Sequence, residues 1–153
     1  MDKFILVQHA PGAPGMRMFG LGPRFMPRDG MRQLKTLFDN NAFWAKGRSL
    51  KDLKLILSKS TLVVSIWGQQ KLIGFGRATS DEIFRATLWD IVIDKNFQNL
   101  GLGEKIVASI LSHPLISKVE KIYLMTTFGN DFYLKMNFKK EDKQNLMVLK
   151  QLK

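Results

Sequence analysis

The segment QNLGLGEK, residues 98–105, combines two glycines with several hydrogen-bond donors at the start of an amphipathic pattern. A β-branched run, LWDIVID, precedes it, so the glycines stand where a strand would pass into a helix. Backbone N–H groups at a helix N-terminus lack internal partners and carry partial positive charge, which stabilises an anion. Gly101 and Gly103 would let such an anion approach the backbone closely. We therefore interpret the turn as a candidate pyrophosphate site, with rim donors at Gln98, Asn99 and Lys105.

The spacing of the two glycines does not match the common nucleotide-binding loops. A dinucleotide fingerprint would need a third glycine at position 106, where this chain has Ile. No G-K-[ST] sequence ends the turn, so an NTPase loop is excluded as well. The bare spacing is also compatible with a helix start whose glycines serve only packing.

Composition limits the class of protein. The 153 residues, 45% of them hydrophobic, suffice for one folded domain with its own core, which we expect to span residues 1–153. The absence of Cys excludes disulfides and thiolate chemistry and is compatible with the cytoplasm. The apolar runs are too short to cross a membrane, and the N-terminal residues lack the pattern of a secretory signal, so we expect no membrane association.

The net charge of +11 favours anionic partners such as phosphates, nucleic acid or an acidic cofactor. The basic residues are scattered and no run reaches five, so a well-solvated surface explains the excess at least as well as a nucleic-acid patch. A basic nucleic-acid-binding domain stays a competing interpretation, but no helix-turn-helix or aromatic RNA-binding motif supports it. His9 and His113 are isolated, so we expect no metal site.

Hydrophobic periodicity predicts a mixed α/β sheet with helices packed against it. Strands are expected at residues 4–8, 61–67, 72–79, 86–94, 121–127 and 145–150. Helices are expected at residues 31–45, after a capping box at 49–52, and at residues 101–112 and 130–138. The glycines in the strand 72–79 indicate a bulge or a close backbone neighbour. Residues 10–30, rich in Gly and Pro, are expected to form a long connector, or a mobile arm with a strand within it.

The order of strand, glycine turn, helix, strand and FYLKMNF segment resembles the GNAT superfamily of acetyl-CoA-dependent N-acetyltransferases. The family segment V-x-P-x-[YF]-[QR]-x-x-G-[LI]-G reads IDKNFQNLGLG here, and F-Y-x-x-x-x-F reads FYLKMNF. The stretch GFGRATSDEIFRATLWDIVIDKNFQNLGLG is similar to a cyanobacterial and plastid subgroup discussed as arylalkylamine (serotonin-type) and protein-lysine acetyltransferases. The resemblance spans roughly residues 30–140. It implies an α/β GNAT fold: about six or seven strands and about four helices, with the sheet splayed between the fourth and fifth strands.

The resemblance also implies an acetyl-CoA site along the fourth strand and the glycine turn. Backbone groups of the strand would pair with the pantetheine arm, and an N–H near Val92 or Ile93 would polarise the thioester carbonyl. Main-chain amides of the turn would hold the pyrophosphate. The implied cofactor-binding residues are Ile91, Val92, Ile93, Gln98, Asn99, Leu100, Gly101, Leu102, Gly103, Glu104, Lys105, Asn130 and Tyr133.

Two residues are catalytic candidates. The resemblance assigns protonation of the leaving sulfur to Tyr133, and the alternative is a half-buried ring on an amphipathic helix. Asp90 alternates with Trp89 and Ile91, so we expect it on the opposite face of the strand. It could accept the amine proton through a water or bind the substrate cation, or be a satisfied polar residue at a splayed edge. The subgroup often carries an acid seven positions before the Tyr, where this chain has Thr126, so the general base stays open.

The acceptor amine is expected near the first two helices and the last strands. Its candidate residues are Phe43, Trp44 and Trp89, although such residues are more often simply core. The acceptor is left open among an arylalkylamine, a polyamine and a protein lysine, and a homodimer is left open as well. A protein of the same fold that binds a CoA ester without catalysis is the alternative to an enzyme.

Overall fold

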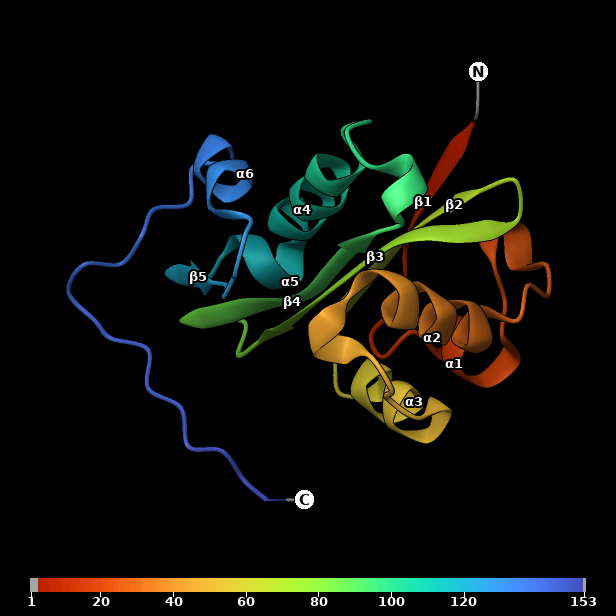
Figure 1. The fold of residues 1–153 in the computed structure, drawn as a ribbon, viewed down its shortest axis with the longest axis horizontal. Coiled ribbons are helices and arrows are strands. Elements are labelled where there is room, and N and C mark those ends of the chain that lie inside the picture. The colour runs from red at the N-terminus through yellow and green to blue at the C-terminus, as the bar shows by residue number, and fades with distance from the viewer. Residues whose placement is uncertain (1–2, 153) are drawn as a thin grey trace.

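The computed structural model describes residues 3–152 as a five-stranded sheet with helices on both faces (Figure 1). The strands are β1 (Phe4–Gln8), β2 (Leu62–Gly68), β3 (Lys71–Ser80), β4 (Arg85–Ile93) and β5 (Lys121–Tyr123). The α-helices are α1 (Pro14–Phe19), α2 (Gly30–Asn41), α3 (Leu50–Ser58), α4 (Leu102–Ser112), α5 (Pro114–Ser117) and α6 (Asn130–Lys135). Three 3₁₀ turns are η1 (Pro23–Phe25), η2 (Phe43–Ala45) and η3 (Lys95–Phe97).

The strands lie in the sheet in chain order. Neighbours from β1 to β4 are antiparallel, whereas β5 is parallel to β4. Helices α1, α2 and α3 cover one face, and α4, α5 and α6 lie on the other (Figure 1). Each face has its own core, with Phe38 and Trp67 among the buried residues of the first and Val64 and Ile106 among those of the second. The turn from β4 to α4 therefore stands at the carboxyl end of the parallel pair.

The main helices follow the apolar periodicity of the sequence. The stripe predicted for α2 is buried, and it consists of Met31, Leu34, Leu37 and Phe38. The predicted cap of α3 also forms, because the Ser49 hydroxyl accepts a hydrogen bond from the Asp52 N–H at 3.0 Å. α2 ends at Asn41, before the predicted boundary, and a separate 3₁₀ turn carries Phe43 and Trp44.

Close packing of α4 explains the two glycines of β3. A Cβ at Gly74 would lie 2.8 Å from Ile93 Cδ1, and a Cβ at Gly76 would lie 2.6 Å from Ile106 Cγ2. The predicted bulge is confirmed, because the register of β3 shifts beside Gly74 and at Gly76, whereas the close neighbours of both glycines are side chains rather than backbone. Because β3 has no side chains at Gly74 and Gly76, α4 packs directly on the backbone of the sheet. This packing fixes the N-terminus of α4 relative to β4.

The C-terminal part differs from the prediction. The strand expected at 121–127 ends at Tyr123, because β4 pairs with β5 only as far as Thr87. The strand expected at 145–150 is wrong: this segment has no regular structure and runs away from the sheet (Figure 1). Its apolar composition signals a local preference, but a strand needs a ladder partner to form. The described residues therefore form five strands rather than six or seven, and six α-helices rather than four.

The Gly- and Pro-rich segment 10–30 is a structured connector. It contains α1 and η1, and Met16 and Ala13 are fully buried in the core beneath α2. The expectation of a strand within it is wrong, since its β pairing is an isolated bridge between Leu21 and Pro27.

A buried polar network joins β1 to β2. His9 Nε2 lies 2.8 Å from the Ser65 hydroxyl, which also accepts a hydrogen bond from Trp67 Nε1 at 2.8 Å. Burial lowers the pKa of His9 from its ordinary value of 6.5 to about 4. His9 is therefore neutral in the folded protein at neutral pH and serves the core.

This network predicts that stability falls on mild acidification. Between pH 6.5 and 4 the unfolded chain binds a proton at His9 that the folded chain excludes, so the free energy of unfolding decreases as the pH falls through this window. The full contribution of His9 is about 3 kcal/mol. Urea unfolding at pH 7 and pH 5 should show a smaller decrease for His9→Gln than for the wild type. His113→Gln is the matched control, and parallel pH dependences for wild type and His9→Gln would contradict the assignment.

Candidate active site

Strands β4 and β5 separate after a short parallel pairing. The last matched pair is Thr87 with Tyr123, while β4 keeps its ladder with β3 up to Ile93. From Leu88 onward, the edge of β4 that faces β5 has no strand partner in the described ladder. Backbone groups on such an edge are free to pair with an amide-bearing ligand. Ile91, Val92 and Ile93, the residues expected on the pantetheine arm, belong to this open part of β4.

A β-bulge directs the end of β4. Asp90 and Ile91 together oppose Gly76 of β3, because the register shifts between Phe75 and Arg77. Asp90 adopts a left-handed φ of 53°, a conformation that Asp tolerates better than most residues. A bulge bends and twists its strand. The bulge lies just past the last β4–β5 pair, so it accounts for the divergence of the two strands.

The N-terminus of α4 is open at the end of β4. Gly101 is its N-cap residue with a φ of 73°, and no side chain caps this helix end. A Cβ added at Gly101 would meet no heavy atom within 4 Å, so the space beside the turn is open to a ligand. The first N–H groups of an eleven-residue helix thus face this space without a side-chain partner.

The other residues of the turn have different roles. Gly103 leaves room for Phe132 of α6, whose ring would lie 3.3 Å from an added Cβ, so packing explains this glycine. The Leu102 side chain is buried, which leaves only its backbone for a ligand. Gln98 Nε2 donates to the Ile93 carbonyl at 3.3 Å and ties the turn to β4. The exposed positions of the turn are Gln98, Asn99, Leu100, Gly101, Glu104 and Lys105.

A groove of about 560 Å³ continues from α4 toward α6. It is lined by Glu104, Ala108 and Leu111 from α4, and by Lys135 and Asn137 at the end of α6. Asn130, the first residue of α6, lies at the opposite end of that helix.

Tyr133 is held on α6 by aromatic packing. Its ring meets those of Phe132 and Phe138 edge to face, and burial raises the pKa of its phenol above the ordinary value of 10. The Thr126 hydroxyl accepts the Gly129 N–H at 2.9 Å at the start of α6. A Cβ at Gly129 would lie 2.8 Å from that hydroxyl and 3.2 Å from the Tyr133 ring. Thr126 therefore stabilises the loop that positions Tyr133.

Asp90 is the centre of a charged cluster. Its Oδ2 accepts from Arg77 Nε at 2.8 Å and from Arg48 Nη1 at 3.2 Å, and its Oδ1 accepts from Trp44 Nε1 at 3.1 Å. The Asp90 side chain is only 4% exposed, against 13% for Arg77 and 32% for Arg48. Its catalytic role stays a prediction, and these contacts favour the alternative of a satisfied polar residue at the splayed edge.

The expectation that Asp90 faces away from Trp89 is wrong. The Arg77 guanidinium stacks over the Trp89 ring at 5.7 Å and also binds Asp90, so both side chains lie on the face covered by α2. The bulge inserts one residue and resets the alternation of β4. Ile91 and Ile93 accordingly pack into the core beneath α4.

An exposed aromatic cluster lies beside this carboxylate. The Phe43 ring is 5.2 Å from that of Trp44 and 6.3 Å from that of Phe128, and the three residues are 65%, 49% and 88% exposed. Phe128 belongs to the segment that follows β5. The aromatic cluster therefore connects η2 with the β5 side of the gap between β4 and β5. Trp89 is more enclosed and donates from Nε1 to Thr79.

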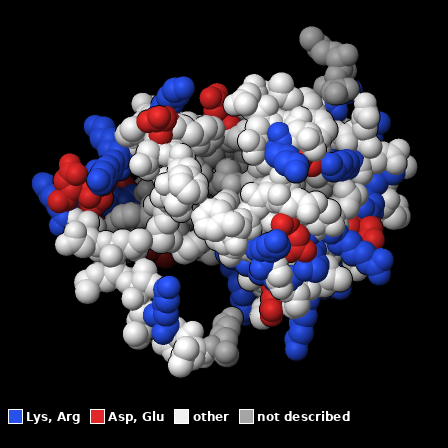
Figure 2. All heavy atoms as spheres, viewed as in Figure 1, with Lys and Arg blue, Asp and Glu red and all other residues white. Residues whose placement is uncertain are grey.

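Charge on the surface is dispersed. Figure 2 shows lysine and arginine side chains spread around the visible face, with acidic groups among them and an uncharged region between. Within residues 3–152, no group of His, Asp and Glu is arranged to hold a metal ion. No described helix is long and apolar enough to cross a membrane.

Sequence reasoning did not find Arg48, Arg77 and Phe128. A detectable signal existed for Arg77, which is a lone charge in the apolar strand LIGFGRAT. The other two reach the site through tertiary contacts, which local patterns do not encode.

Comparison with known proteins agrees with this geometry. Residues 31–138 match the model of the acetyltransferase (GNAT) family. An uncharacterised N-acetyltransferase, ycf52, of Pyropia yezoensis is 39% identical over 108 residues, which cover 64% of this chain and 59% of the relative. The chain thus spans about three fifths of that relative's length. The ycf52 protein of Gracilaria tenuistipitata var. liui is 33% identical over 145 residues, 90% of this chain and 76% of that protein.

The fold also matches solved structures. A GNAT-family acetyltransferase from Xanthomonas campestris pv. campestris superposes with a TM-score of 0.73 over 99% of this chain and 95% of that one. The two sequences are 16% identical, so this similarity concerns the fold alone.

The Asp90 cluster predicts a large loss of stability for Asp90→Asn. Asn tolerates the left-handed conformation, so the change removes charge from beside two guanidinium groups with little backbone strain. We expect the free energy of unfolding, measured with urea, to fall by about 2–3 kcal/mol. This loss is smaller than that for a fully buried ion pair, because Arg48 is partly exposed. Glu120→Gln breaks the exposed Arg85–Glu120 pair and should leave stability nearly unchanged. Equal effects of the two changes would show that the Asp90 cluster does not support the fold.

Proposed function

The chain belongs to the acetyltransferase (GNAT) family, and from this premise we propose that it transfers an acetyl group from acetyl-CoA to a primary amine. One observation carries the proposal: a single strand, β4, both opens its edge beside β5 and leads into an uncapped helix N-terminus. The open edge suits an amide-bearing chain, and the helix end suits a diphosphate. Coenzyme A contains these two groups in that order.

The cofactor would lie along β4. Its pantetheine arm would pair with backbone groups of residues 91–93, and Asn130 would add a donor from α6. Its diphosphate would accept hydrogen bonds from main-chain amides between Asn99 and Glu104. The groove between α4 and α6 continues from this turn, and Lys135 at its wall suits the remaining phosphate of the nucleotide end.

The reaction needs positioning, an unprotonated amine and a proton for the leaving sulfur. The ammonium form of the acceptor first loses a proton to solvent, the neutral amine then forms the C–N bond by attack on the thioester carbonyl, and a backbone N–H near Val92 stabilises the oxygen as it gains charge. The C–S bond then breaks and Tyr133 gives its proton to the departing sulfur. The nitrogen releases its second proton to solvent, and the Tyr133 phenolate takes one back from solvent. The raised pKa of Tyr133 keeps the phenol protonated at neutral pH, as an acid must be.

The proton acceptor is less defined than the acid. Thr126 is not a base near neutral pH and is engaged in the turn before α6. Both oxygens of Asp90 already accept hydrogen bonds from protein donors. Asp90 would therefore act mainly through the arginines that it holds, and an amine that deprotonates in water needs no fixed base.

Thr126, where the subgroup often has an acid, also favours a second candidate function: binding of a CoA ester without turnover. Calorimetry with acetyl-CoA and a thiol-release assay with several amines separate the two functions. Saturable binding with turnover supports the enzyme, whereas binding without turnover of any amine supports the sensor. Steeply salt-dependent DNA binding without CoA binding would contradict both.

The proposed acid, Tyr133, can be tested by removal of its hydroxyl. Tyr133→Phe removes only the hydroxyl, so we expect a fall in kcat of about 10²–10⁴-fold, the range for lost general-acid catalysis. The dissociation constant for acetyl-CoA should change by less than about threefold, since this is below 1 kcal/mol. Phe138→Leu, which alters the packing around the ring without removing the acid, is the matched comparison. A wild-type rate for Tyr133→Phe would exclude Tyr133 as the acid.

The proposed diphosphate site at Gly101 can be tested by a branched side chain. Gly101→Val places a branched side chain in the space beside the turn and at a left-handed φ, so acetyl-CoA affinity in calorimetry should fall by about tenfold or more. Gly47→Val is the matched control, because Gly47 also has a positive φ, of 82°, with no heavy atom near its missing Cβ. Both variants should lose about 1–2 kcal/mol of stability. Only Gly101→Val should weaken acetyl-CoA binding. Unchanged affinity for acetyl-CoA would show that the diphosphate does not bind at this turn.

A further inference from the structure

The charged cluster beside the splay is not neutral. Arg48 and Arg77 share one carboxylate, Asp90, and both bind the same oxygen. Asp39, the other acid near η2, is already engaged by Lys35 at 3.0 Å and by the Gly47 N–H. The cluster therefore carries one uncompensated positive charge at the mouth of the proposed acceptor site.

The two guanidinium groups keep most of their donors free. Each has five N–H bonds, and each gives one hydrogen bond to Asp90. Within residues 3–152, their side chains make no other hydrogen bond, only stacking contacts with Phe38 and Trp89. None of these unused donors is sealed from the surface, since the one buried side-chain donor that lacks a partner among residues 3–152 belongs to Arg17. A planar anion could thus be bound by two or more N–H groups at once.

The surroundings add an apolar wall. Phe43, Trp44 and Phe128 present exposed rings, and Trp44 links them to the cluster through its hydrogen bond with Asp90. Asp90 lies two residues before Val92, whose N–H is proposed to face the thioester oxygen. An anion held by the arginines would consequently lie close to the attacking amine.

We infer that the acceptor is an aromatic amino acid, in which a carboxylate lies next to the primary amino group. Arg48 and Arg77 would bind the carboxylate, and the aromatic ring would lie against Phe43, Trp44 and Phe128. This inference rests on the proposed function and narrows it to one substrate class. Cationic acceptors such as polyamines and lysine-rich segments meet the same positive charge and are disfavoured. An arylalkylamine fits the rings but offers no anion to the guanidinium N–H groups that Asp90 leaves unused.

Matched acceptors test the role of the carboxylate. Tryptophan and tryptamine differ only in this group, and tryptophanamide replaces it with a neutral amide. With saturating acetyl-CoA, we expect kcat/KM for tryptophan to exceed that of the other two by about 10–100-fold, the range for hydrogen bonds to a charged group. The difference should appear mainly in KM, because the carboxylate binds without reacting.

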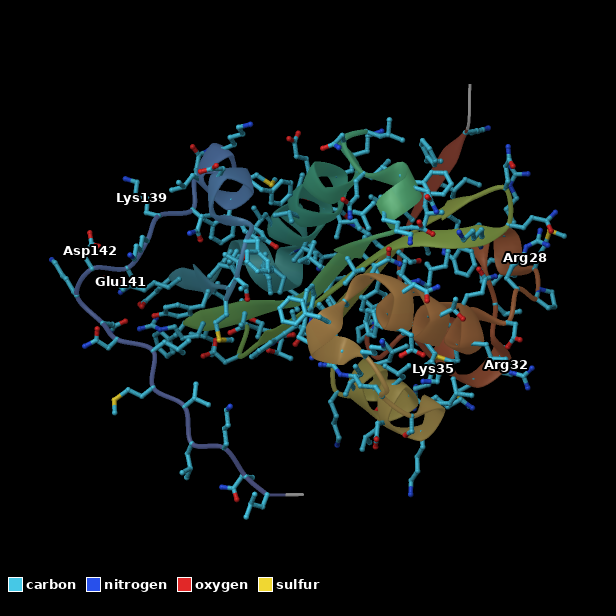
Figure 3. The ribbon with its side chains drawn as sticks, viewed as in Figure 1. Arg28, Arg32, Lys35, Lys139, Glu141 and Asp142 are labelled. Atoms are coloured by element: carbon cyan, nitrogen blue, oxygen red, sulfur yellow. The ribbon has the colours of Figure 1, made fainter. Side chains whose placement is uncertain are left out.

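Variants test the arginines. Arg48→Gln leaves Arg77 as partner of Asp90, and should lower the ratio of kcat/KM for tryptophan to that for tryptamine by about tenfold or more. Arg32→Gln is the matched control, because Arg32 is exposed on α2, pairs only with nearby Asp29 and points outward (Figure 3). It should leave the ratio unchanged, and thermal unfolding would verify that both variants are folded.

The outcomes separate the inference from the function beneath it. One outcome is that the protein binds acetyl-CoA but acetylates tryptamine, a polyamine or a peptide at least as fast as tryptophan. This outcome overturns the inference and leaves the acetyltransferase function intact. The same holds if Arg48→Gln leaves the tryptophan-to-tryptamine ratio unchanged. Absence of acetyl-CoA binding overturns the proposed function and the inference together.

Discussion

The bulge at Asp90 is the constraint on which the rest of the site depends. One extra residue in β4, held at a left-handed φ, turns the strand away from β5 just after their last paired residues. The same extra residue moves Ile91 and Ile93 into the core beneath α4 and leaves Asp90 on the face of α2. The splay, the core and the charged cluster are therefore consequences of one local irregularity.

The position of α4 depends on the strand next to the bulge. Bare backbone at Gly74 and Gly76 brings Ile106 and Ile93 against β3, so α4 cannot shift without a clash. The short turn from Ile93 to Leu102 is further restrained, because Asp94 caps η3 and pairs with Lys71 at 2.7 Å. The open helix end and the open strand edge are thereby kept in a fixed relation. A helix end suited to an anion and a strand edge suited to an amide chain thus form one proposed site because packing, rather than the turn itself, aligns them.

Sequence patterns sufficed for the parts of the fold governed by local periodicity. The stripes of α2 and α4, the Ser49 cap and strands β1 to β4 follow from spacing, and the glycine turn was located by its place between strand and helix. The patterns failed where pairing decides the structure. Residues 145–150 have strand composition but no partner, and residues 124–127 lose theirs at the splay. Simple alternation also misplaced Asp90, because a bulge in one strand shows only in its register with the next. Arg48 and Phe128 were missed for the same reason, since each joins the site from a loop distant in sequence.

The energetics of the Asp90 cluster indicate what the cluster is for. Burying a carboxylate with two guanidinium groups costs desolvation that the ion pairs only partly offset, and apolar residues of similar size would stabilise a core at least as well. The cluster is therefore a weak device for stability even though removing one member is costly. Its effect is geometric: Asp90 fixes the guanidinium groups of Arg48 and Arg77 and the indole of Trp44 beside the open part of β4. Such preorganisation lowers the entropic cost of binding a planar anion there. The overall charge is +11, and the lysine and arginine side chains are dispersed over the face that Figure 2 shows, whereas this single uncompensated charge lies at the mouth of the proposed acceptor site.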